Sequence, residues 1–304
     1  MTEPARSTTP VATDPARARR ILLAVTLLGV MAVAAAAIAT ITDARVPGAH
    51  SAETASPPLV VGDGRTVTLI SLGAPDTDAV LTRVSGDIGS AVAAVEGFWG
   101  TDWTHEIVIV ATRSADQFAV QAGGDQRGDT AALAVADHLD VVRRTATGQR
   151  IVLAPGAGSM DTEDLRIVLG HELFHYAARA DTAPDAPRWL TEGVADYVAR
   201  SSAGETTAIS RIGLPTALPA DVDLTGDAEQ LSVAYDRAWL FARYIADRYG
   251  EPALRALYER ACGAGHNGMP EAFRQILGAT PPEILGDWRR WLDVRAVRHP
   301  GPSG

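Results

Sequence analysis

An uninterrupted apolar segment near the N-terminus constrains this chain more than any other feature. Residues 21–41 contain no charged side chain, and as a helix they would extend roughly 31 Å, about the thickness of a bilayer's hydrocarbon core. Arg17, Arg19 and Arg20 precede this segment, so the positive-inside rule places residues 1–20 in the cytoplasm. The sequence therefore predicts one transmembrane helix over 21–41 and an extracytoplasmic location for everything after it.

A cleaved signal peptide is the alternative interpretation of the same segment. Ala37-Ile38-Ala39 has the small-residue form of a cleavage site. That triplet lies inside the apolar run, and signal peptides normally have shorter apolar regions of about 7–15 residues. The length favours a retained anchor, and both interpretations export the rest of the chain.

The anchor is followed by a predicted linker and then by one folded domain. Residues 42–58 are rich in proline, glycine and serine and lack hydrophobic periodicity, which is typical of a linker. Residues 59–298 form the predicted domain, with a first part over 59–180 and a helical half over 187–298. Residues 299–304 contain two prolines and two glycines and form a predicted flexible tail.

Composition excludes several classes of protein. The chain has 46% hydrophobic residues, enough for a packed core, and a net charge of −10 with a pI near 5.2. This charge argues against a nucleic-acid surface, which needs clustered positive charge. Cys262 is the only cysteine, so the chain contains neither an intrachain disulfide nor a four-cysteine zinc site.

Hydrophobic periodicity predicts an α+β domain. A small N-terminal β-sheet with helices and the active-site helix is expected first, followed by an all-helical C-terminal half. Strands are predicted over 66–72, 105–111 and 150–154. Helices are predicted over 77–99, 115–122, 161–180, 187–202, 233–249, 252–262, 269–277 and 281–297.

The helix predicted over 161–180 carries the pattern His171-Glu172-Leu173-Phe174-His175, which is H-E-x-x-H. Residues four positions apart lie on one face of a helix, so both imidazoles point to the same side and can bind one Zn²⁺. A catalytic zinc keeps three protein ligands and one position for water. Glu172 is then placed to activate the zinc-bound water as a general base.

The third ligand is expected from the next helix. Glu192 and Asp196 lie four apart on one face of the predicted helix over 187–202, and the chain between the two helices allows them to pack together. We predict Glu192 as the third zinc ligand and Asp196 as the acceptor of the free ring N–H of one histidine. The alternatives are a surface carboxylate at 192 and a solvent-facing acid at 196.

These residues resemble a known family. HELFH followed by RWLTEGVADYVA is similar to the gluzincin zinc peptidases, and most similar to the bacterial peptidase-MA-like domains, over about residues 150–200. The resemblance implies a zinc peptidase with an antiparallel edge strand above the active-site helix, for which residues 150–154 are the candidate. Some relatives use a downstream Tyr or His to stabilise the oxyanion. Tyr235 is our catalytic candidate for this role, but its position among Val233, Trp239, Leu240 and Phe241 favours core packing.

The chain also departs from related patterns. No G-x-M-E-N element precedes the helix, so an aminopeptidase pocket for the substrate's N-terminus is not indicated. The metzincin pattern would need glycine at 178 and histidine at 181, where this chain has Ala178 and Asp181. Asp181 is therefore a weaker rival for the third ligand. Loops over 123–130 and 202–231 are expected to line the pocket, and the second is long enough to form a lid.

The sequence thus predicts a membrane-anchored, zinc-dependent peptidase that hydrolyses peptide bonds of exported or envelope proteins. Its expected partners are a protein or peptide substrate and the membrane, without nucleic acid, and its oligomeric state is left open. The alternative is a non-catalytic anchored domain that binds zinc or presents helices to a partner. Glu172 favours the enzyme, because a closed structural zinc site leaves no water to activate.

Overall fold

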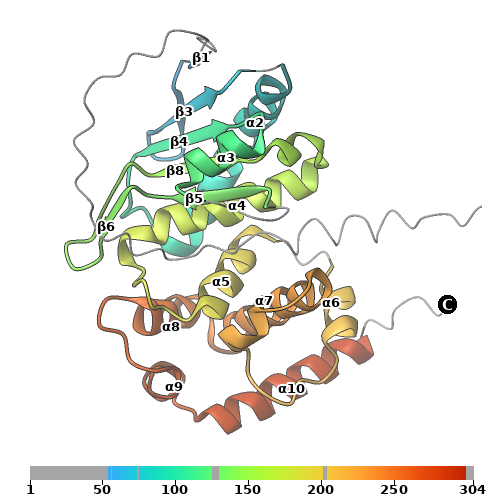
Figure 1. The fold of residues 1–304 in the computed structure, drawn as a ribbon. Helices are drawn as coiled ribbons and strands as arrows, with labels where there is room; N and C mark the ends of the chain where they lie inside the picture. Colours follow the sequence, from blue (N-terminus) through green and yellow to red (C-terminus); the bar gives the residue numbers. More distant parts are fainter. Residues whose placement is uncertain (1–53, 56, 74, 125–129, 201–203, 299–304) are drawn as a thin grey trace, which may run out of the picture.

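The computed structural model describes residues 54–55, 57–73, 75–124, 130–200 and 204–298 (Figure 1). The predicted cytoplasmic tail, the transmembrane segment 21–41 and the C-terminal tail 299–304 lie outside these residues. Within the described part of the chain, none of the helices has the length and hydropathy needed to cross a bilayer.

The N-terminal half contains a six-stranded mixed sheet with the order β1-β3-β4-β8-β5, in which β2 also pairs with β3. The three central strands β3, β4 and β8 are parallel, whereas β5 is antiparallel to β8 at one edge. A separate antiparallel hairpin consists of β6 and β7. The strands are β1 Thr54–Ala55, β2 Leu59–Val61, β3 Arg65–Ser71, β4 Glu106–Ala111, β5 Ala132–Val135, β6 His138–Asp140, β7 Thr145–Thr147 and β8 Arg150–Leu153.

Two features of the sheet differ from expectation. Strand β1 lies within the range 42–58 that was predicted as a linker. The prediction of residues 150–154 as the edge strand is wrong, because β8 lies inside the sheet between β4 and β5. The edge strand is β5, whose sequence ALAV is poor in the β-branched and aromatic residues that mark a strand.

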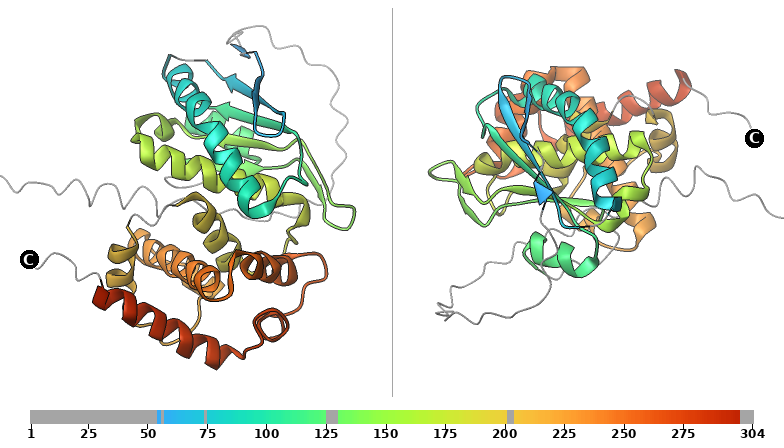
Figure 2. Two further views of the ribbon diagram at one scale, coloured as in Figure 1. Left: turned by 180° about the vertical axis from the view of Figure 1, so that it is seen from behind. Right: turned by 90° about the horizontal axis from the view of Figure 1, so that it is seen from above.

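Helices cover both faces of the sheet. Helices α2 (Pro75–Trp99) and α4 (Thr162–Ala178) pack together in the main core with one face of β4 and β8. Helix α3 (Ala115–Ala122) forms a smaller cluster with the other face of β8 and β5. Figure 2, seen from above, shows α2 and α3 on opposite sides of the sheet.

The C-terminal half is helical, and no described residue after β8 belongs to a strand. This confirms the predicted α+β fold with a small sheet first and a helical half second. Two short 3₁₀ helices lie before and after α4, namely η1 Pro155–Ser159 and η2 Arg179–Asp181. The remaining elements are α5 Arg188–Ala199, α6 Glu205–Ile212, η3 Asp221–Leu224, α7 Ala228–Tyr249, α8 Glu251–Cys262, α9 Met269–Leu277 and α10 Pro281–Arg298.

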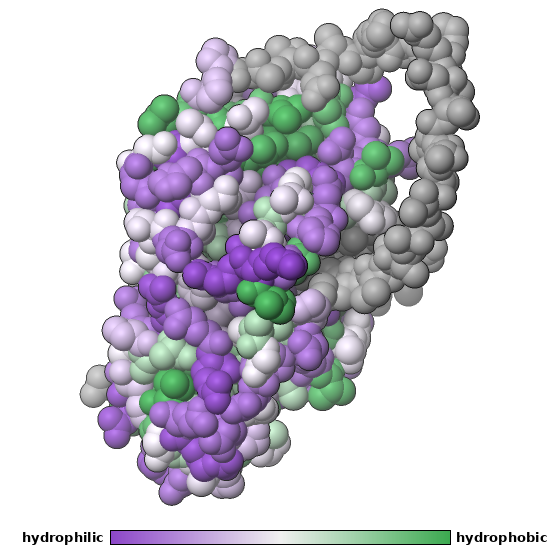
Figure 3. Space-filling view, turned by 90° about the vertical axis from the view of Figure 1, so that its left-hand side faces the viewer, coloured by the Kyte–Doolittle hydropathy of each residue, from purple (hydrophilic) through white to green (hydrophobic). Residues whose placement is uncertain are grey.

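The surface of this fold is mostly polar on the face that Figure 3 shows. Hydrophilic residues cover most of it, and the largest group of apolar residues visible there lies near the top, over the half that contains the sheet (Figure 3).

The long segment predicted as a loop over 202–231 contains α6 and η3, and both pack against α7.

Helices α5 and α7 lie close together at Gly193, the residue after Glu192. A methyl group at Gly193 would lie 2.6 Å from the carbonyl oxygen of Ala238 and 2.9 Å from its carbonyl carbon. Any larger side chain must therefore push the two helices apart. Gly193 thus helps to position Glu192, because the absence of a side chain allows the backbones of α5 and α7 to come into contact.

We expect Gly193→Ala to lower the free energy of unfolding by about 1–3 kcal/mol, because the backbone of α7 cannot move aside as a flexible side chain would. Urea unfolding measures this change. Gly89→Ala on α2 is the matched control, since a methyl group there would meet nothing within 4 Å. The control should be neutral or stabilising by up to about 1 kcal/mol, and equal effects of the two substitutions would contradict the account.

Candidate metal centre

The H-E-x-x-H residues lie in the middle of α4, which is buried on most of its surface. Asp161 caps this helix, since its Oδ1 accepts a hydrogen bond from the N–H of Asp164 at 2.9 Å. The rings of His171 and His175 lie one turn apart, with their Nε2 atoms 3.1 Å from each other. The helix therefore presents two imidazole nitrogens to one point.

Helix α5 brings Glu192 to the same point. Glu192 Oε2 lies 3.2 Å from His171 Nε2 and 3.6 Å from His175 Nε2. The start of α5 is held by Asp221 on η3, whose Oδ1 accepts a hydrogen bond from the N–H of Trp189 at 2.8 Å. Among the described residues, these three side chains form the group of donor atoms that could hold a metal ion, all within 4.8 Å of one another.

The spacing of these donors fits a zinc ion. Four ligands arranged tetrahedrally at about 2.0–2.1 Å from zinc lie ~3.3 Å from one another. The three distances of 3.1, 3.2 and 3.6 Å between the ring nitrogens and the carboxylate oxygen are close to that value. Two neutral imidazoles and one carboxylate are also a donor set that zinc prefers at catalytic sites.

Asp196 orients the first of the two histidines. Its Oδ1 lies 2.9 Å from His171 Nδ1 and both groups are buried. A proton on Nδ1 that is donated to Asp196 leaves the lone pair of Nε2 pointing toward His175 and Glu192. The structure thus places Asp196 beside the Nδ1 of His171.

Glu172 lies beside the three donors without joining them. Its Oε2 accepts a hydrogen bond of 2.7 Å from the backbone N–H of Ala134 on β5, whereas its buried Oε1 has no hydrogen-bond partner among the described residues. Burial raises the pKa of the Glu172 carboxyl above its usual range, although the neighbouring histidines act in the opposite direction. One oxygen therefore holds the side chain in place while the other can accept a proton.

Tyr235 on α7 is buried on the Glu192 side of the site. Its hydroxyl accepts a hydrogen bond of 3.4 Å from Arg188, and the Nε of Arg188 lies 4.0 Å from Glu192 Oε1. Burial raises the pKa of Tyr235 well above its ordinary value and the charge of Glu192 raises it further, so the phenol keeps its proton.

Two arginines beside the site were not predicted. Arg188 lies four residues before Glu192 on the same helix, a spacing that could have indicated their contact. Arg179 follows α4 and donates a hydrogen bond of 2.5 Å to the backbone oxygen of Ala134, the residue whose N–H holds Glu172. No sequence pattern indicates this second contact, because it depends on how β5 lies over α4.

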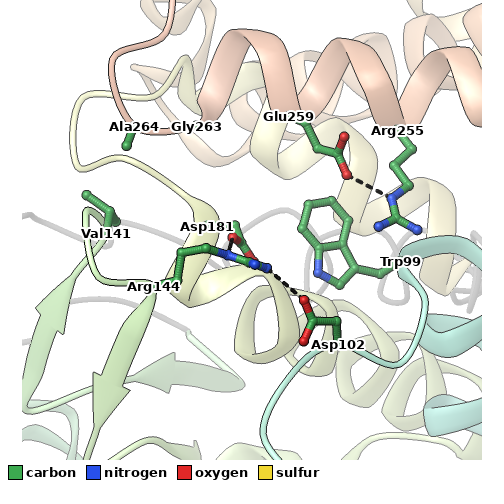
Figure 4. Close-up of a pocket in the computed structure, with 9 residues that line it drawn as sticks. All are labelled: Trp99, Asp102, Val141, Arg144, Asp181, Arg255, Glu259, Gly263 and Ala264. Atoms are coloured by element: carbon green, nitrogen blue, oxygen red, sulfur yellow. Dashed lines mark hydrogen bonds and ion pairs between the residues drawn. The ribbon is translucent and has the colours of Figure 1, made fainter.

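The rival ligand Asp181 points elsewhere. It forms an ion pair with Arg144, which also contacts Asp102, and these side chains line a cavity of about 470 Å³ (Figure 4). None of the H-E-x-x-H residues lines this cavity, and Asp181 does not belong to the three-donor group. The remaining wall of the cavity consists of Trp99, Val141, Arg255, Glu259, Gly263 and Ala264.

Comparison with known proteins gives matches among solved structures only. No protein-family model and no curated protein sequence match the chain. A mutant of an M1 zinc metallopeptidase from Deinococcus radiodurans is similar, with 17% identity, a TM-score of 0.49 and coverage of 79% of this chain and 52% of that chain. The mutant bound to a Tyr-Ser-Ala substrate has 16% identity, a TM-score of 0.48 and coverage of 79% and 51%. This chain thus spans about half the length of these structures.

The site predicts a measurable proton release when zinc binds. Burial by itself lowers the pKa of His171, but Asp196 and Glu192 outweigh burial and raise it to about 10. The metal-free protein therefore holds a proton on His171 at pH 7 that zinc must displace, because only the unprotonated nitrogen binds metal. We expect zinc binding to release about one proton at pH 7, and the affinity to rise about tenfold from pH 7 to pH 8.

Calorimetric titration in two buffers with different ionisation enthalpies measures this proton release. The observed heat should differ between the buffers by about one ionisation enthalpy per zinc bound. Equal heats in both buffers, together with an affinity that does not change between pH 7 and pH 8, would contradict the expected competition between proton and metal.

Proposed function

We propose that this protein is a membrane-anchored, zinc-dependent peptidase whose domain faces the extracytoplasmic side and hydrolyses peptide bonds of exported or envelope proteins. One observation carries the catalytic part of the proposal. His171, His175 and Glu192 converge at the spacing of zinc ligands, and the buried Glu172 beside them keeps one oxygen without a hydrogen bond. The anchor and the location rest on the apolar segment 21–41 and the arginines before it.

Each residue has a distinct chemical task in this proposal. His171, His175 and Glu192 hold the metal, and Asp196 holds His171 in the required tautomer. Bound zinc would polarise the scissile carbonyl and lower the pKa of water toward about 7. Glu172 Oε1 takes the proton from the attacking water and then delivers it to the leaving amine, for which its raised pKa is suited.

Two further groups are available to the reaction. Tyr235 remains a neutral phenol and can donate a hydrogen bond to the oxyanion of the tetrahedral intermediate, and Arg188 contacts both Tyr235 and Glu192. Core packing, the other interpretation of Tyr235, is supported by its burial. The two roles are compatible, because only the hydroxyl needs to reach the substrate.

The outer edge of β5 contacts the proposed base. Every second residue of an antiparallel strand directs its N–H and C=O groups to the same side. The C=O of Ala131 points toward β8, because it accepts a hydrogen bond from the N–H of Ala154. The backbone groups of Ala132 and Ala134 therefore face away from β8. Those of Ala134 bond Glu172 and Arg179, and Ala132 and Ala134 are both buried, so this edge of β5 holds the proposed base in place.

Hydrolysis of a peptide library by the purified full-length chain tests this function. Cleavage should be present with zinc, disappear with a chelator and return when zinc is added back. Binding of zinc without cleavage of any library peptide would instead favour the anchored zinc-binding domain. Cleavage that survives complete removal of the metal would overturn the proposed mechanism.

A further inference from the structure

A chain of buried ion pairs leads away from the proposed metal site. Asp196 Oδ2, on the side opposite to His171, lies 2.7 Å from Arg200 Nη2. Arg200 Nη1 lies 3.1 Å from Asp236 Oδ1 on α7, and Asp236 Oδ2 lies 2.7 Å from Arg211 Nη1 on α6. The side chains of Asp196, Arg200, Asp236 and Arg211, here called the ion chain, thus connect α5, α7 and α6 in one line.

The ion chain is enclosed and its formal charges balance. Its two carboxylates are 4% and 9% exposed, and its two guanidinium groups are 14% and 25% exposed. Two acids face two arginines, so each charge of the ion chain contacts at least one charge of opposite sign. Surface ion pairs contribute little, but groups this buried cannot exchange their partner for water without a cost.

Arg200 is the centre of the ion chain and is held from several sides. Its planar guanidinium contacts Asp196 and Asp236 with different nitrogens and lies 5.1 Å from the ring centroid of Trp239. A lysine ammonium does not offer this fixed fork of donors. At the far end, Arg211 also donates a hydrogen bond of 2.6 Å to the hydroxyl of Ser232, which fixes that end on α7.

We propose that Arg200 and Asp236, with Arg211 behind them, are positioning residues that act through Asp196 to hold His171 in the orientation that binds the metal. This inference rests on the zinc site of the proposed function. Asp196 lies within hydrogen-bond distance of His171 with one oxygen and forms an ion pair with Arg200 through the other, so the position of Arg200 influences how the carboxylate is turned. Groups that orient a metal-binding histidine typically change metal affinity by about 10–100-fold when they are removed.

The ion chain also gives α6 a role at the metal site. Helix α6 lies in the segment predicted as a loop, and it contacts α7 through two separate ion pairs. One is Arg211 with Asp236, which belongs to the ion chain, and the other is Glu205 with Arg243 at 2.7 Å, which does not. The second pair provides a matched control on the same pair of helices.

The test is the zinc dissociation constant of the metal-free full-length chain, measured by competition with a fluorescent chelator. We expect Arg200→Met to weaken zinc binding about tenfold or more, and Asp236→Asn to weaken it about threefold because Arg200 keeps its contact with Asp196. Arg243→Met should change zinc affinity less than twofold, although it removes an ion pair between the same helices. Cobalt absorption spectra should shift for Arg200→Met and remain unchanged for Arg243→Met, since they report ligand geometry.

Each outcome decides between the alternatives. If the unsubstituted chain binds no zinc, both the proposed function and this inference fail. If it binds zinc and Arg200→Met binds equally well, only this inference fails. Equal weakening by Arg200→Met and Arg243→Met would show a general loss of stability and would also overturn it. Should Arg200→Met not fold, as thermal unfolding would reveal, Asp236→Asn decides, because it keeps the size of the side chain.

Discussion

Glu172→Gln should leave one zinc bound per chain and lower kcat/KM for peptide hydrolysis by about 100-fold to 10,000-fold, the range that a general base typically contributes. The glutamine oxygen can still accept the hydrogen bond from the N–H of Ala134, so the side chain should keep its place on α4. An amide cannot take a proton from water at neutral pH, so the chemical step loses its base. The metal is retained because Glu172 is not one of the three converging donors.

Glu163→Gln is the matched control for this substitution. Glu163 lies in the exposed first turn of the same helix, so the same chemical change there should leave both zinc and turnover unaltered. Peptide cleavage and metal content are measured on both variants. Turnover by Glu172→Gln at the rate of the unsubstituted chain would remove Glu172 from the mechanism, and loss of its zinc would show that it helps to hold the metal.

Glu192→Gln should weaken zinc binding by more than about 100-fold and abolish hydrolysis at ordinary zinc concentrations. The substitution removes the carboxylate that faces both ring nitrogens and replaces a negative ligand with a neutral amide. Two imidazoles alone form an incomplete site. The effect should therefore exceed that of Arg200→Met or Asp236→Asn, since Arg200 and Asp236 act on only one histidine and do so through Asp196.

Asp181→Asn distinguishes between Asp181 and Glu192, the two carboxylates that the sequence indicated as candidates for the third zinc ligand. Asp181 contacts Arg144 and lines a different cavity, so its substitution should leave zinc affinity within about twofold of the original. Competition with a chelator measures both variants under the same conditions. A large loss with Asp181→Asn and none with Glu192→Gln would reverse the assignment.

The helices were predicted well where their ends carry local signals. The bounds of α3 and α9 agree with the sequence, since glycines with φ of 80° and 66° follow their last residues and favour a left-handed conformation there. Helix α7 starts five residues earlier than expected. Asp227 and Gln230 form a capping box at its start, a pattern that was present in the sequence.

The missed elements depend on contacts that are distant in sequence. Half of strand β5 is alanine, and pairing with β8 gives it its conformation. Helix α6 is short and largely polar, and it is held by the contacts of Glu205 and Arg211 with α7 and of Glu205 with Arg295 on α10. The hairpin of β6 and β7 turns at Arg144 with φ of 52°, where a glycine would have been the usual signal.

The same distinction applies to the candidate site. Helical spacing alone predicted that the two histidines and Glu172 lie together. Glu192 and Asp196 could be added to the site because their helix comes directly after a turn that allows it to pack against the first. The contact of Ala134 with Glu172 and the contacts of Arg200 with Asp236 join residues about 36 to 38 positions apart. Such contacts follow from how the layers pack, which local periodicity does not encode.

X-ray absorption at the zinc edge of the full-length chain tests most directly whether two imidazoles and one carboxylate share a single cation. We predict one zinc per chain, surrounded by two nitrogen ligands from histidine and by oxygen ligands at about 2.0–2.2 Å. A chain that holds no zinc when purified with the metal, or one whose zinc spectrum does not change in Glu192→Gln, would contradict the account.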